Sequence, residues 1–120
     1  MNLPELMDKL ERLPSQIQQA GQKAADAKGK VTYMREFKKI VFSQEFITAM
    51  NSEEKKTVTM GEAEAYQSKN YRYHIEGLEV AEKEFNRTQA NYEAKKAEFD
   101  SCRSLLALEK RMVSIDTNQN

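Results

Sequence analysis

Large apolar residues recur at every seventh position through the second half of the chain. This row reads Tyr71, Leu78, Phe85, Tyr92, Phe99, Leu106 and Val113. The row three residues later is mixed and reads His74, Ala81, Thr88, Lys95, Cys102 and Glu109. A seven-residue repeat with large residues at one core position is typical of a coiled-coil helix. The capping-box spacing from Thr59 to Glu62 marks its start, so the pattern predicts one helix over residues 60–113.

The first half carries a second pair of rows with the same repeat. One row is Leu3, Leu10, Ile17, Ala24, Val31 and Lys38, and the other is Leu6, Leu13, Ala20, Ala27, Met34 and Val41. The phase continues across Pro14, although a proline inside a helix costs about 3 kcal/mol. We therefore expect two helices, over residues 3–13 and 15–50, that stay nearly collinear across a kink at Pro14.

The two predicted arms have similar lengths and are joined by the polar stretch 51–56. This layout predicts an all-α fold, a long antiparallel helical hairpin that forms one domain over residues 1–113 and pairs positions summing to roughly 111. In that register the leucines of residues 3–13 lie opposite residues 99–106, and the alanines of residues 20–27 lie opposite the aromatic stretch 85–92. Residues 114–120 are mostly polar and predict a disordered tail.

The segment before the connection is apolar on most sides of the predicted helix, which one partner helix cannot cover. We expect a second copy of the chain to cover it, giving an oligomer and a helical bundle. The candidate interface residues are Phe37, Ile40, Phe42, Phe46 and Ile47.

Composition excludes several classes of function. The chain has 19 basic and 19 acidic residues, one His and one Cys, so we expect no metal site, no cofactor, no catalytic residues and no enzyme activity. His74 and Cys102 are interpreted as packed core residues. No apolar run approaches the ~20 residues that span a bilayer, and the N-terminus does not resemble a signal peptide. We therefore expect a cytoplasmic protein with no membrane partner and no small-molecule substrate.

Charge is uneven along the chain, with a basic segment at residues 23–39 and an acidic one at 76–84. The basic residues are a candidate nucleic-acid-binding strip, with an aromatic side chain for base stacking. The strip comprises Lys28, Arg35, Lys38, Lys39, Lys55, Lys56 and Tyr73. The alternative interpretation is that the two segments form ion pairs between the arms and fix their register.

The layout resembles the small Glu/Lys-rich coiled-coil proteins that tailed bacteriophages encode beside their recombination genes. The resemblance lies in the opening residues 3–11, the Lys/Glu turn and the run of residues 90–99. It implies an accessory role in phage DNA recombination or replication, as an oligomer that binds DNA or a recombination protein. The alternatives are a phage inhibitor of a host protein such as a defence nuclease, and a structural scaffold.

Overall fold

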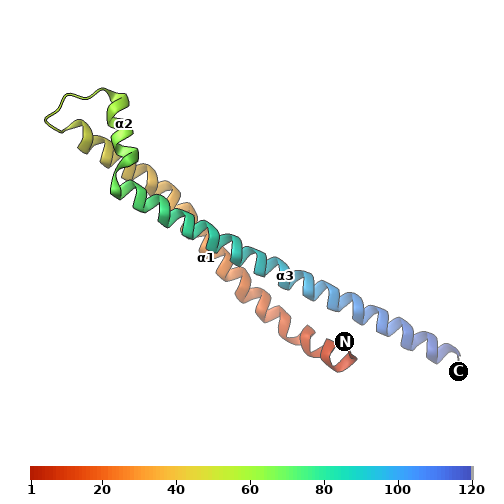
Figure 1. The fold of residues 1–120 in the computed structure, drawn as a ribbon. Coiled ribbons are helices and arrows are strands. Elements are labelled where there is room, and N and C mark those ends of the chain that lie inside the picture. Colours follow the sequence, from red (N-terminus) through yellow and green to blue (C-terminus); the bar gives the residue numbers. More distant parts are fainter. Residues whose placement is uncertain (120) are drawn as a thin grey trace. The chain divides into compact units, whose positions relative to one another are not determined.

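The computed structural model describes residues 1–119, with side chains described as far as Ile115, and all its regular elements are helices (Figure 1). Helix α1 spans Leu3–Met50, α2 spans Val58–Gln67 and α3 spans Lys69–Gln119. The chain forms two compact units. Unit 1 contains Met1–Ala24 with Arg87–Asn120, and unit 2 contains Ala25–Asn86. The all-α prediction is therefore confirmed for the described part of the chain.

The core of unit 1 joins the first turns of α1 to the second half of α3. Leu6, Leu13 and Cys102 are buried, and the partly buried side chains packed on them are Leu10, Ile17, Phe99 and Leu106. Farther along, a Cβ added to Gly21 would lie 3.1 Å from the ring of Tyr92. The absence of a side chain at Gly21, which belongs to neither row, thus leaves room for an aromatic ring of α3.

The core of unit 2 is built from the same rows. Val31, Leu78 and Ala81 are buried, with Met34 and Phe85 packed against them. The smaller residues of the mixed row are more buried than most residues of the large row, because larger side chains on both sides of them exclude water. Along α3, Ala81, Thr88 and Cys102 are 3%, 8% and 2% exposed, whereas most of the large row is half-buried.

Helix α1 continues through Pro14, so the predicted division into helices 3–13 and 15–50 is wrong. Proline removes one backbone hydrogen bond, but Leu13 and Ile17 pack on the same cluster just before and after it. Burial on both sides offsets the local cost and keeps the turn helical. The kink at Pro14 stays a prediction.

The predicted helix 60–113 is divided in two at Ser68 and starts earlier than expected. Thr57, not Thr59, caps α2, since its side chain accepts a hydrogen bond from the amide of Met60 at 3.2 Å. Ser68 then leaves the helical conformation, with φ −62° and ψ 146°. Its hydroxyl donates to the carbonyl of Ala65 at 2.9 Å and accepts from the amide of Tyr71 at 3.2 Å. One serine therefore caps the end of α2 and the start of α3.

The far end of α3 also differs from the sequence-based expectation. The helix extends to Gln119, beyond the predicted end at residue 113. The last residue of the predicted disordered tail, Asn120, lies outside the described residues.

Candidate functional site

In unit 2, α2 covers part of the apolar surface that was assigned to an oligomer interface. The ring of Phe42 lies 4.6 Å from that of Tyr66 and 6.0 Å from that of Tyr71, measured between centroids. Burial, followed by the neighbouring Tyr66 phenol, raises the pKa of Tyr71. A Cβ on Gly61 of α2 would lie 3.1 Å from the ring of Phe46. Phe42 and Phe46 thus have partners within their own chain, because the break at Ser68 supplies a helix that the sequence did not reveal.

A row of exposed residues remains on α1 within unit 2. Tyr33, Ile40 and Ile47, spaced by seven, are 66%, 50% and 57% exposed. Exposed polar or small residues alternate with them at the intervening heptad positions. We call this set the outer stripe; its members are Gly29, Tyr33, Glu36, Ile40, Ser43 and Ile47. The sequence-based interface contained Ile40 and Ile47 but not Tyr33, although Tyr33 lies seven residues before Ile40.

A series of ring contacts connects the outer stripe to α3. The Tyr33 and Phe37 rings stack at 5.8 Å, and Phe37 lies 5.1 Å from the His74 ring. His74 in turn contacts Tyr73 edge-on at 6.2 Å. Tyr73 is 73% exposed. An open groove of about 350 Å³ beside it is lined by Met34, Tyr73, His74, Glu76, Gly77 and Val80. This edge of unit 2 therefore has aromatic and aliphatic side chains at its surface.

Half of the candidate nucleic-acid-binding cations are bonded to carboxylates. Arg35 pairs with Glu82 at 3.2 Å, which is an ion pair between the basic and acidic segments. Lys39 pairs with Glu36 at 3.4 Å, and Lys56 pairs with Glu64. The remaining three cations have no ion pair within the described part of the chain; they are Lys28, Lys38 and Lys55. The strip thus offers phosphate groups fewer free charges than its composition suggested.

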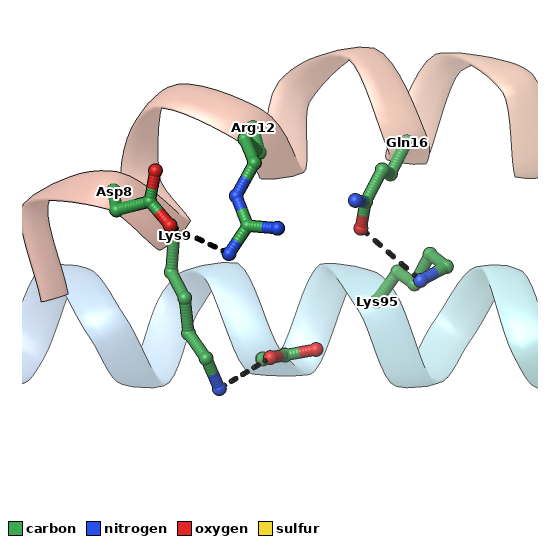
Figure 2. Close-up of polar contacts among 6 residues, drawn as sticks. Asp8, Lys9, Arg12, Gln16 and Lys95 are labelled. Atoms are coloured by element: carbon green, nitrogen blue, oxygen red, sulfur yellow. Dashed lines mark hydrogen bonds and ion pairs between the residues drawn. The ribbon is translucent and has the colours of Figure 1, made fainter. Parts of the chain in front are cut away.

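Polar contacts along unit 1 join the two helices at defined positions (Figure 2). Lys9 donates a hydrogen bond to Glu98 at 3.0 Å, and Lys95 donates one to Gln16 at 3.3 Å. The bond from Lys9 lowers the pKa of Glu98 and correspondingly raises that of Lys9. These contacts fix the local register of unit 1.

Unit 1 also has an exposed apolar end that the sequence analysis did not identify. A groove of about 370 Å³ is lined by Leu3, Met7, Leu106, Glu109, Lys110 and Val113. Four further residues near this end of α3 are apolar and exposed, at steps of three and four, although they do not line the groove. These residues are Leu105, Leu108, Met112 and Ile115.

The described residues interact through packing, hydrogen bonds and ion pairs between side chains. No group of three or more His, Cys, Asp or Glu in that range is placed to hold a metal ion. Cys102 is buried in the unit 1 core and His74 packs between two rings. Within the same range, no helix is both apolar enough and long enough to traverse a bilayer.

No protein-family model matches the chain, and comparison with curated proteins and with solved structures gives no significant match.

Proposed function

We propose that this chain is a non-enzymatic accessory protein of phage DNA recombination or replication that acts in the cytoplasm by binding another protein. The observation that carries this proposal is the groove at the edge of unit 2, where Tyr73 and Val80 are 73% and 67% exposed. Tyrosine is enriched at protein interfaces, and an exposed apolar surface is typical of an interaction site. The phage setting rests on the resemblance of the sequence to coiled-coil proteins encoded beside recombination genes.

The proposal includes the arrangement of the chain. α1 and α3 form one antiparallel hairpin that bends at Pro14 and self-associates into a bundle. Two pairs of contacts support the antiparallel direction, one pair in each unit. In unit 1, Lys9 contacts Glu98 and Gln16 contacts Lys95. In unit 2, Arg35 contacts Glu82 and Glu45 contacts Asn70. Within each unit the partner number therefore falls as the α1 number rises.

A protein partner is favoured over DNA because of the ion pairs in the basic strip. A cation that already holds a carboxylate must give up that bond before it can hold a phosphate. DNA binding is the second candidate, supported by the unpaired cations Lys28, Lys38 and Lys55 and by the exposed ring of Tyr73.

Fluorescence anisotropy with labelled single- and double-stranded DNA at low salt distinguishes these candidates. We expect no binding at micromolar protein, and no difference between the wild type and Lys28→Glu/Lys55→Glu. Binding that weakens in this variant and falls steeply with added salt would establish DNA as the partner instead.

The protein partner is tested by size-exclusion chromatography with a purified phage recombinase and, separately, with a host defence nuclease. We expect a complex with the recombinase that Tyr73→Ala weakens. Ala63→Ser is the matched control, since Ala63 is also exposed but lies on α2, away from the groove. A complex with the nuclease alone, accompanied by inhibition of cleavage, would support the anti-defence function.

A further inference from the structure

The outer stripe has the spacing of a third coiled-coil seam. Its members follow one another at steps of four, three, four, three and four residues. Large side chains occupy one core position, at Tyr33, Ile40 and Ile47. Small or polar residues occupy the other, at positions 29, 36 and 43. The same alternation of large and small residues packs the cores of both units, but no helix in the described part of the chain covers the stripe.

The stripe is complementary in size to a second copy of itself running in the opposite direction. A two-fold axis beside Lys38 would place Ile47 opposite Gly29 of the second copy. The same axis would place Tyr33 opposite Ser43 and Ile40 opposite Glu36. Every large residue then faces a small or flexible one, and all of these pairs are in register at once.

Gly29 provides separate support, because no described residue of its own chain fills the space beside it. A glycine inside a helix weakens that helix, since the unfolded chain gains conformational freedom. Gly21 and Gly61 admit neighbouring side chains, whereas a Cβ at Gly29 would meet nothing within 4 Å. In the antiparallel pairing, the Ile47 side chain of the second copy would lie over this position.

Charge also favours the antiparallel direction. Glu36 and Lys39 form an ion pair on the exposed surface, next to the axis. In the antiparallel arrangement each Glu36 approaches Lys39 of the other copy, and these attractions oppose the repulsion between the two Lys39 side chains beside the axis. A parallel pair would place Glu36 against Glu36, which like-charge repulsion disfavours.

We propose that the outer stripe is a two-fold, antiparallel homodimer interface between α1 helices. This inference rests on the oligomer in the proposed function and gives it a surface and a direction, with Phe42 and Phe46 kept inside the chain. A helix pair of this length buries on the order of 1,000 Å² in total, the lower limit for a specific interface. An interface of this size is expected to be weak, so micromolar chain concentrations are the range in which to measure it.

Disulfide crosslinking of the full chain tests the direction. Under mild oxidation, Gly29→Cys/Ile47→Cys should give a covalent dimer, because each new cysteine faces the other one across the axis. Each single variant should stay uncrosslinked, and so should the wild type, whose Cys102 is buried. Circular dichroism checks that each variant folds. A covalent dimer of Ile47→Cys alone would indicate parallel helices and overturn the proposal.

Sedimentation equilibrium across micromolar concentrations tests whether a second copy binds the outer stripe and whether Glu36 and Lys39 contribute to that binding. We expect a monomer–dimer equilibrium whose dissociation constant rises about tenfold in Glu36→Lys. The swap Glu36→Lys/Lys39→Glu should restore it, since both the internal pair and the pairs across the axis are rebuilt. A wild-type monomer at every concentration, or no rescue by the swap, would overturn the proposal. These results do not depend on DNA or a recombinase, so failure here is distinguishable from failure of the proposed function.

Discussion

Gly29 and Gly61 are both helical residues of unit 2, but their surroundings differ. In dilute solution, where chains are separate, Gly29→Ala should raise the free energy of unfolding by about 1 kcal/mol, because alanine favours the helix and meets no neighbour. Gly61→Ala should lower it by about 1–3 kcal/mol, since its Cβ would lie 2.5 Å from the Met50 sulfur. Urea unfolding of both variants measures the two changes. Changes of the same sign would contradict the packing described around Gly61.

The contact between Lys9 and Glu98 gives unit 1 a dependence on pH. The pKa of Glu98 is lowered from 4.5, so its stabilising contribution is present above that value and is lost as pH falls through the lowered pKa. The pKa of Lys9 is raised from 10.5, so its contribution is present below that value and is lost as pH rises through the raised pKa. Urea titrations below pH 4.5 should show a weaker pH dependence in Glu98→Gln than in the wild type. An unchanged slope would show that the pair does not form in solution.

At the scale of elements, Ser68 has the greatest influence on how α2 and α3 are arranged. Its hydroxyl bonds to Ala65 at the end of α2 and to Tyr71 at the start of α3. Ser68→Ala removes both bonds and should lower the free energy of unfolding by about 1 kcal/mol. Ser101→Ala is the control, because Ser101 is exposed in the middle of α3 and alanine is the better helix former. Thermal or urea unfolding that shows equal stability for both variants would contradict the double cap.

At the scale of the whole molecule, self-association should make thermal unfolding depend on concentration. Only folded chains dimerise, so the melting temperature of the protein rises with its concentration. We expect an increase of a few degrees between about 1 and about 100 µM chain. Glu36→Lys should flatten this dependence while leaving the melting temperature at the lowest concentration nearly unchanged. A melting temperature independent of concentration in the wild type would show that the chain unfolds as a monomer.

The buried faces of α1 and α3 follow from the sequence alone. The seven-residue rows identify Leu6, Leu13 and Cys102 as neighbours in unit 1, and Val31 with Leu78 in unit 2, as the structure shows. This success has a simple cause, because burial of apolar side chains is the dominant favourable term and periodic spacing places them on one face. The ion pair between Arg35 and Glu82 agrees with the alternative interpretation of the two charged segments, in which they pair with each other.

The tertiary structure decided where the helices are interrupted. Local helix propensity favours a break at Pro14 over one at Ser68, yet α1 continues through Pro14 and the chain leaves the helix at Ser68. Local preferences differ by only about 1–3 kcal/mol per residue, so packing around them determines the outcome. Packing of Leu13 and Ile17 holds the turn at Pro14, whereas the break at Ser68 lets Tyr66 cover Phe42. The contact between Phe42 and Tyr66 joins two different helices, and the residue pattern of neither helix predicts it.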